Sequence, residues 1–379
     1  MNWRLIVWSC LGGAALFMIM GGAWIVSLPP ARAVGAPAPI AREEADATIA
    51  ALQPRKRLRP LIAIIGINDA TETTDYLMPY GILRRADVAD VVAVATNPGP
   101  MLLFPALTVE PQATVADFDA RYPEGADYVI VPAMSRDDDP AALNWIKNQA
   151  GKGAMIIAVC AGAKVVAAAG LLTDKRATTH WYYLKELRKK HAAIHYVADR
   201  RLVVDEGVAT TTGISASMPM TLVLIEAIAG RDKAQAVGRD LGVMSWDARH
   251  VSDAFRFTRP FALTAIANTL AFWRHEQLGI ELAPAVDEVS LALVADAWSR
   301  TYRSRAVTFA GTHHAQPSRN GIQIVPDRVA ASWPAKRLLP PSESPKPARV
   351  LDEALRAIAT RYGSHTADFV AMQLEYTPS

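Results

Sequence analysis

Cys160 is the residue of this chain best suited to nucleophilic chemistry. It follows an uncharged apolar run, residues 154–159, that is typical of a strand buried on both faces of a parallel sheet. After it comes an Ala- and Val-rich segment, residues 164–169, that ends at Gly170 as a helix would. Backbone N–H groups and the helix dipole at such a strand-to-helix turn would favour a thiolate. The alternative is a buried cysteine that serves only as a small apolar side chain.

The composition of the 379 residues argues against several other kinds of chemistry. The chain has 40 basic and 37 acidic residues, and a net charge of +3 gives no electrostatic case for nucleic acid as a partner. The second cysteine, Cys10, lies in an apolar N-terminal segment, so no intramolecular disulfide is expected. His313 and His314 are adjacent and not spaced as metal ligands. No glycine-rich phosphate-binding motif follows a predicted strand, and we therefore expect neither a metal nor a cofactor.

The elements that must position Cys160 alternate in type along residues 61–230. Short apolar runs predict strands, amphipathic segments predict helices, and Asp139 before Pro140 is a typical helix start. This alternation predicts a doubly wound, mostly parallel α/β sheet with helices on both faces. In such sheets the reactive groups gather at the carboxyl ends of the strands, where Cys160 falls. The predicted strands are 61–65, 88–96, 128–132 and 154–159, the helices 76–86 and 140–149, and a hairpin lies at 103–110.

The N-terminal segment, residues 5–28, is one uncharged run. Such a run is long enough to cross a hydrocarbon core of about 30 Å, and longer than the apolar region of a typical signal peptide. We expect an uncleaved single-pass transmembrane helix, with the soluble part exported. A signal peptide cleaved after the small residues Ala31 and Ala33 is the alternative. Basic residues flank the run on both sides, so they barely discriminate between orientations.

Three further motifs resemble the ThiJ/PfpI superfamily, which has a class I glutamine-amidotransferase-like fold. They are the small-residue elbow at 159–163, the segments 170–172 and 177–181 (GLL and ATTHW), and the Thr-Gly turn at 212–213. The ATTHW segment is most similar to isocyanide hydratases and to the sensor halves of AraC-type regulators. The resemblance covers about residues 61–230.

The resemblance implies an acidic partner for the elbow cysteine in the loop after the first strand. That loop offers Asp69, Glu72 and Asp75. Aligning Pro79 and residues 83–86 with the corresponding family helix places Asp75 at the position of the acid. A useful acid beside a thiolate would be protonated, with a pKa raised by burial. Asp75 could also serve as the N-cap of the helix that follows it, and one residue can do both.

Two departures from the family pattern limit which of the family's site residues can be assigned to this chain. The peptidase members carry His directly after the cysteine, where this chain has Ala161, so a Cys–His peptidase is not expected. His180 could approach Cys160 as an accessory base, although its segment more plausibly packs at a domain edge. The family's glycine pair after the third strand is replaced by Ala133 and Met134, whose amides could still help to form an oxyanion pocket.

The second half of the chain contains a possible degenerate repeat. A helix, a strand and a hairpin follow Asp287 up to Pro326, as they follow Asp75 up to Pro111, over 39 and 36 residues. Two unrelated segments are the alternative. A later helix at 349–362 is not followed by a basic recognition helix, so DNA binding is not expected. The expected divisions are a transmembrane anchor (1–28), a linker (29–60), a ThiJ/PfpI-like domain (61–235), a C-terminal α/β region (236–333), a Pro-rich connector (334–348) and a helical segment (349–379).

Together these observations predict a membrane-anchored, cysteine-dependent hydratase or hydrolase. Cys160 would attack a small electrophile such as an isocyanide, a carbonyl compound or an amide, while Asp75 carries the proton. The alternative is a non-catalytic protein that binds a small ligand, or that senses oxidants through the Cys160 thiol. A homodimer is implied by the resemblance alone.

Overall fold

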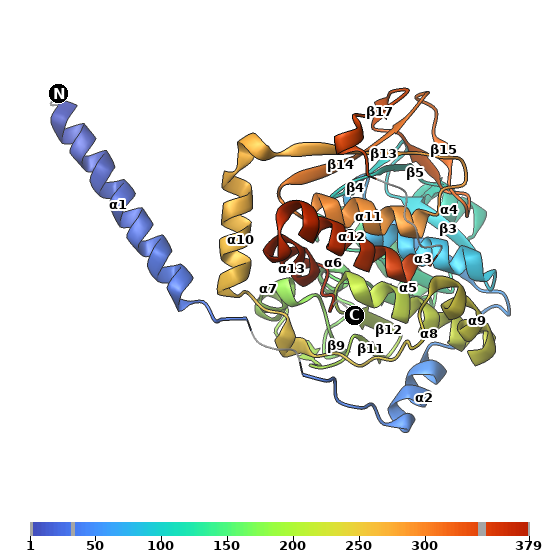
Figure 1. Ribbon diagram of the computed structural model, residues 1–379. Coiled ribbons are helices and arrows are strands. Elements are labelled where there is room, and N and C mark those ends of the chain that lie inside the picture. Colours follow the sequence, from blue (N-terminus) through green and yellow to red (C-terminus); the bar gives the residue numbers. More distant parts are fainter. Residues whose placement is uncertain (1–2, 32–34, 340–345, 378–379) are drawn as a thin grey trace.

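The fold is described from a computed structural model that covers residues 3–31, 35–339 and 346–377 (Figure 1). Part of the predicted cleavage site, residues 32–34, and part of the Pro-rich connector, residues 340–345, lie outside the described residues. Two helices precede the main body, α1 (Trp3–Ser27) and α2 (Arg42–Ala51). In Figure 1, α1 extends away from the rest of the chain.

The predicted N-terminal transmembrane helix is wrong. Crossing a bilayer as a helix requires about 20 consecutive, predominantly apolar residues. Over the ranges that the structure describes, no helix combines sufficient length with sufficient apolar character to cross a membrane. The expected single-pass membrane localisation is wrong for the same reason, and the expected membrane partner is not supported.

The predicted α/β sheet is confirmed. Its seven strands lie in the order β11–β12–β8–β7–β1–β3–β6, and all neighbours are parallel except β11 and β12. The carboxyl ends of the central strands therefore meet at one edge, as the sequence predicts. The strands are β1 (Leu61–Gly66), β3 (Asp90–Ala95), β6 (Ala113–Thr114), β7 (Tyr128–Val131), β8 (Met155–Ala158), β11 (Leu202–Asp205) and β12 (Val208–Thr211).

Successive side chains of β1 enter two different apolar cores. Ile62 and Ile64 belong to the core that contains α3 (Thr73–Ala86) and α8 (Ser217–Ala229). Leu61, Ala63 and Ile65 point to the opposite face, which α4 (Val115–Arg121), α5 (Pro140–Gly151) and α6 (Gly162–Ala168) help to cover. A strand buried on both faces reads as a continuous apolar run, which explains the sequence pattern.

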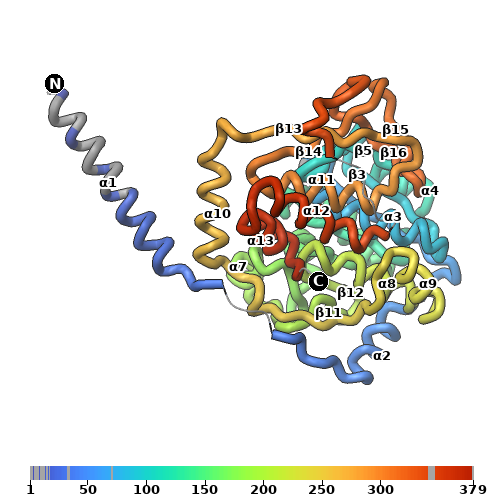
Figure 2. Tube along the Cα trace, viewed as in Figure 1, coloured from blue at the N-terminus to red at the C-terminus, as the bar shows by residue number. Residues whose placement is uncertain are grey.

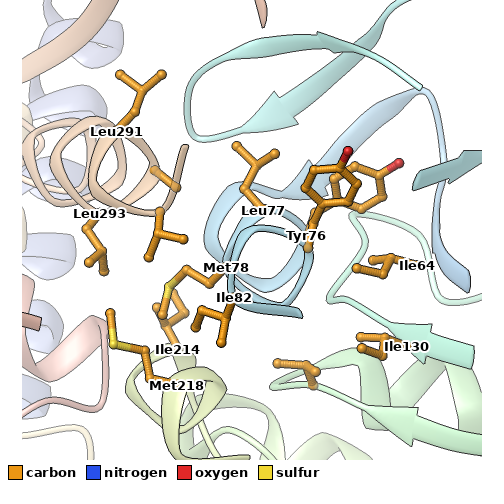
Figure 3. Packing of buried hydrophobic residues seen from close by; sticks show 14 of the residues in the cluster. Ile64, Tyr76, Leu77, Met78, Ile82, Ile130, Ile214, Met218, Leu291 and Leu293 are labelled. Atoms are coloured by element: carbon orange, nitrogen blue, oxygen red, sulfur yellow. The ribbon is translucent and has the colours of Figure 1, made fainter. Parts of the chain in front are cut away.

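A smaller region of the second half packs on the outer side of α3. It holds a parallel sheet in the order β13–β14–β17 and the helix α11 (Glu288–Ser299), which lies against α3. Figure 3 shows Leu291 and Leu293 of α11 on one side of α3 and Ile64 and Ile130 of the central sheet on the other. The strands are β13 (Glu276–Glu281), β14 (Ser304–Ala310) and β17 (Arg328–Val329).

A five-stranded sheet joins the two halves. Its order is β15–β16–β5–β4–β2, so strands of the first half pair with strands of the second. The predicted hairpin at 103–110 is its β4–β5 pair. One apolar core extends from Leu52 to Leu374, and the predicted division into domains stays a prediction. The strands are β2 (Asp69–Glu72), β4 (Met101–Phe104), β5 (Thr108–Glu110), β15 (Gln316–Pro317) and β16 (Gln323–Val325).

The remaining elements frame this core. The short strands β9 and β10, with α7 between them in the chain, pair in parallel, and α12 and α13 pack against each other near the C-terminus. The bounds are β9 (Arg176–Ala177), α7 (Leu184–Lys190), β10 (His195–Tyr196), α9 (Arg231–Leu241), α10 (Arg259–Leu270), α12 (Pro347–Tyr362) and α13 (Ser364–Gln373).

Candidate active site

The predicted elbow is present between β8 and α6. Cys160 has a φ of 57°, in the left-handed region that a residue with a Cβ rarely adopts. Two threonines hold this conformation: the Cys160 N–H donates to Thr211 Oγ1 (3.1 Å), and Thr179 Oγ1 donates to the Cys160 carbonyl (3.0 Å). A strained backbone of this kind costs about 1–3 kcal/mol and persists only where its surroundings fix it. The elbow therefore presents the thiol in one defined direction.

Close packing against β7 explains the glycine at the start of α6. A Cβ on Gly162 would lie 2.1 Å from the carbonyl oxygen of Val131. Backbone cannot yield as a flexible side chain can, so only glycine allows the elbow to approach the end of β7. This contact places the elbow beside the carboxyl end of β7.

Gly162→Ala is therefore expected to destabilise the fold by about 1–3 kcal/mol or more, because the added methyl group overpacks the core. Thermal unfolding of the purified variant measures this. Gly151→Ala is the matched control: Gly151 ends α5 with nothing within 4 Å of the added Cβ. An unchanged melting temperature for Gly162→Ala would show that the elbow is not so tightly held.

Asp75 lies in the first turn of α3, with no exposed surface. Its Oδ2 accepts a hydrogen bond from the Ala133 N–H (3.1 Å), and its carboxyl group interacts with the Cys160 thiol. The other oxygen, Oδ1, is buried without a hydrogen-bond partner. The N-cap of α3 is Glu72, whose carboxylate accepts from the Asp75 N–H at 2.6 Å. The expected capping role thus belongs to Glu72, and the Asp75 carboxyl remains available to the thiol.

Burial sets the protonation of this pair. Loss of solvent raises the pKa of Asp75 to about 7, against the opposing effects of the Ala133 amide and the Arg300 cation. Near neutral pH both forms of this carboxyl group are populated, as a proton carrier requires. Burial and the negative charges of Asp75 and Glu72 raise the pKa of Cys160 well above its ordinary value. The expectation that the elbow favours a thiolate is therefore wrong for this arrangement, because burial and two acids outweigh the backbone amides.

A charged residue from the second half completes the surroundings of the acids. Arg300 Nη2 donates to Glu72 Oε1 at 2.8 Å, and Arg300 Nε donates to both carboxylate oxygens of Asp296 at 2.8 and 2.9 Å. Burial is the main cause that raises the pKa of Glu72 well above its ordinary value. Three buried carboxyl groups thus share one guanidinium, and holding all three ionised would leave uncompensated charge in the core. At least one of these three carboxyl groups must therefore be protonated.

The other predicted residues have different positions. His180 Nδ1 accepts from the Tyr182 N–H (3.2 Å) and Nε2 lies 2.9 Å from the Gln373 carbonyl, so both ring nitrogens are engaged away from Cys160. Burial also lowers the pKa of His180, which favours the neutral ring. The neighbouring Thr179 is the residue of this segment that contacts the elbow.

The backbone groups proposed for an oxyanion pocket are only partly free to serve it. The Ala161 amide interacts with the Cys160 sulfur. The Ala133 amide is taken by Asp75, and its carbonyl accepts from the Glu72 N–H (2.8 Å). Met134 forms an isolated antiparallel bridge with Thr71. Within the described ranges, no group of three or more His, Cys, Asp or Glu residues could hold a metal ion.

Comparison with known proteins identifies the part of the chain that carries this site. The model of the DJ-1/PfpI family matches residues 62–227, which include Asp75 and Cys160 but not Arg300. The isonitrile hydratase of Pseudomonas putida is 34% identical over 167 residues, which are 43% of this chain and 70% of that protein. The Parkinson disease protein 7 homolog of Danio rerio is 26% identical over 181 residues, 46% of this chain and 93% of that protein. The crystal structure of Drosophila melanogaster DJ-1beta covers 49% of this chain and 100% of its own, with a TM-score of 0.44 and 21% identity.

Proposed function

The chain belongs to the DJ-1/PfpI family, and from this premise we propose that it is a cysteine-dependent hydratase or hydrolase acting on a small electrophile. Cys160 is the nucleophile and Asp75 the proton carrier. The observation that carries the proposal is the burial of both groups, the Cys160 thiol held at the elbow and the Asp75 carboxyl group whose pKa burial raises to about 7. A carboxyl group poised near the operating pH can accept a proton in one step and return it in the next.

The reaction begins from a neutral thiol. As the Cys160 sulfur attacks, its proton passes to the ionised Asp75 carboxylate, so a preformed thiolate is not required. Asp75 then gives this proton to the substrate atom that has become basic. The unpartnered Oδ1 of Asp75 is the oxygen available for this transfer, because Oδ2 already accepts from Ala133.

An isonitrile is the substrate class that one relative favours, since a protein named isonitrile hydratase is 34% identical over 167 residues of this chain. Addition of the thiol across the terminal carbon forms a sulfur–carbon and a carbon–hydrogen bond and gives a thioimidate. Water then attacks the same carbon, the sulfur–carbon bond breaks, and the thiol recovers its proton. The net reaction consumes one water, releases an N-substituted formamide, and oxidises or reduces nothing.

Access to the thiol favours small substrates. Only 4% of the Cys160 surface is exposed, so a bulky molecule could not reach the sulfur without movement of the surrounding elements. A compact, linear isonitrile group fits this restriction better than a folded peptide does. Ala161 in place of a histidine further disfavours a peptidase.

The test is turnover of a panel of small isonitriles, amides and aldehydes by the purified chain. Formation of the N-substituted formamide, followed by proton NMR, is expected for the wild type and not for Cys160→Ala. Formamide production that survives in Cys160→Ala would contradict the proposal. The thiol-sensor alternative would be supported if the wild type turned over none of these compounds while peroxide oxidised Cys160 to a sulfenic acid faster than it oxidises free cysteine.

A further inference from the structure

The second half of the chain repeats the order of elements of the first. Strand β1, helix α3, strand β3, the hairpin β4–β5 and strand β6 follow in this order in the first segment, which has in addition the short strand β2 between β1 and α3. Strand β13, helix α11, strand β14, the hairpin β15–β16 and strand β17 do so in the second. Both segments form a parallel sheet in corresponding order, β1–β3–β6 and β13–β14–β17. Two unrelated segments would not be expected to share both connectivity and strand order.

The correspondence keeps an almost constant register. β13 starts at 276 where β1 starts at 61, β15 at 316 where β4 starts at 101, β16 at 323 where β5 starts at 108, and β17 at 328 where β6 starts at 113. These four strands of the second segment thus begin 215 positions after their counterparts. Only β14, at 304 against 90, departs from this by a single residue.

This register corrects the alignment made from sequence. At a separation of 215, the counterpart of Asp287 is Glu72 and not Asp75, and each of the two acids is the N-cap of its helix. The intervals from Glu72 to Pro111 and from Asp287 to Pro326 are then both 39 residues. The counterpart of Asp75 is Ser290, so the second segment lacks the proton carrier.

The two segments dock about an approximate twofold axis. α3 packs against its counterpart α11, and Figure 2 shows these two helices side by side. β5 pairs antiparallel with its counterpart β16, with Val109 directly opposite Ile324, which is 215 positions later. Pairing of an element with its own counterpart is the signature of an isologous dimer interface.

Two reciprocal ion pairs cross this interface. Arg85 in the last turn of α3 pairs with Asp287, the N-cap of α11. Arg300 at the end of α11 pairs with Glu72, the N-cap of α3, at 2.8 Å. Each arginine follows the acid of its own helix by 13 positions. Close approach of the helices is permitted by Gly81, where an added Cβ would lie 2.4 Å from Glu288 Oε1.

We propose that residues 276–329 are a degenerate copy of residues 61–114 that serves as a built-in second subunit, and that its Arg300 is a positioning residue for the Cys160 site. Arg300 holds the Glu72 carboxylate, which in turn accepts from the Asp75 N–H. Its symmetry mate Arg85 holds Asp287. In that half Ser290 stands at the position of Asp75, and the second segment has no cysteine elbow. The Arg300–Glu72 and Arg85–Asp287 pairs are therefore alike in structure, but only Arg300–Glu72 acts on the Cys160 thiol. This role of Arg300 rests on the proposed function of Cys160 and Asp75.

The experiment compares Arg300→Gln with its internal control, Arg85→Gln, in the full-length chain. Each variant removes one arginine of the reciprocal pairs. The readouts are thermal unfolding, and the pH midpoint of the rate at which iodoacetamide alkylates Cys160. Arg300→Gln is expected to move this midpoint upward by about 1 pH unit, because an opposite charge near the acids is lost. Arg85→Gln is expected to leave the midpoint unchanged although it also lowers the melting temperature.

A second variant, in the same segment 276–329, is expected to shift the alkylation midpoint in the opposite direction. Asp296→Asn removes a negative charge near Asp75 while keeping the size of the side chain, so the alkylation midpoint is expected to move downward. This variant also replaces Arg300→Gln should the latter not fold. The role of Arg300 would be overturned if Arg300→Gln, Arg85→Gln and Asp296→Asn all kept the alkylation midpoint of the wild type while Asp75→Asn shifted it. The proposed function would be unaffected by that result. Absence of any shift in Asp75→Asn would instead overturn the proposed function.

Discussion

Asp75→Asn is expected to lower turnover of an isonitrile by about 10²–10⁴-fold, the usual contribution of a positioned proton carrier. The asparagine side chain has nearly the same shape as the carboxyl group but cannot accept the proton of the attacking thiol. The same substitution removes a negative charge that raises the pKa of Cys160, so the thiol is expected to ionise at lower pH. Steady-state formation of the formamide and iodoacetamide alkylation across pH measure the two effects.

The control is Asp69→Asn, at the start of β2 and six positions before Asp75. Asp69 is exposed and pairs with Arg136 at the surface, away from the thiol. Turnover by this variant is expected to match the wild type. If Asp75→Asn kept its turnover, or if its thiol ionised at a higher pH than that of the wild type, Asp75 could not be the proton carrier. Loss of turnover together with an easier thiolate would show that proton delivery, and not thiolate formation, limits the reaction.

The parts of this site that the sequence predicts are those determined by local patterns. The apolar run before Cys160 and the small residues after it specify a buried strand and a tight turn, whatever the rest of the chain does. Asp75 was found by aligning a helix with that of a family, which also depends on neighbouring residues only. Both features are built from fewer than 30 consecutive positions of the chain.

The electrostatics of the site could not be predicted in this way. Arg300 lies 228 positions from Glu72, and in the sequence it is one arginine among many in a polar segment. The expected thiolate was wrong for a related reason. The pKa of Cys160 is raised first by burial of the thiol itself and then by the negative charges of Asp75 and Glu72. One of these acids, Glu72, is bound by Arg300 from the second half of the chain. The residues around Cys160 in the sequence do not show which distant residues will bury the site.

The proposed repeat differs in register from the one expected from the sequence. Asp75 and Asp287 share a residue type, whereas Glu72 and Asp287 share a structural position at the N-caps of paired helices. Because few residues are identical between the copies, the acid type alone led to an alignment three positions away. The homodimer expected from the resemblance stays a prediction.

The buried acids also predict an unusual dependence of stability on pH. Asp75 has a pKa of about 7 in the folded chain and an ordinary value of 3.8, so between these values the folded state holds a proton that the unfolded state has lost. Stability contributed by this group is therefore present at low pH and lost as the pH rises toward 7. Between pH 5 and pH 8 the loss amounts to about 3 kcal/mol. His180, whose pKa is lowered by burial, acts in the opposite direction below its ordinary value of 6.5.

Comparing the wild type with Asp75→Asn isolates this contribution, because His180 is present in both. At pH 5 the unfolded wild type has already lost the Asp75 proton that the folded wild type keeps, so urea titration is expected to show the variant as somewhat more stable than the wild type. From pH 5 to pH 8 this advantage of the variant is expected to grow by about 3 kcal/mol, since the folded wild type must ionise the buried Asp75 whereas the asparagine has no charge to bury. A wild type as stable as the variant at pH 8 would mean that Asp75 ionises without penalty, and a carboxyl group so well accommodated would not return its proton to a substrate. A more stable but inactive variant would instead identify Asp75 as a group whose burial is retained for chemistry at the expense of stability.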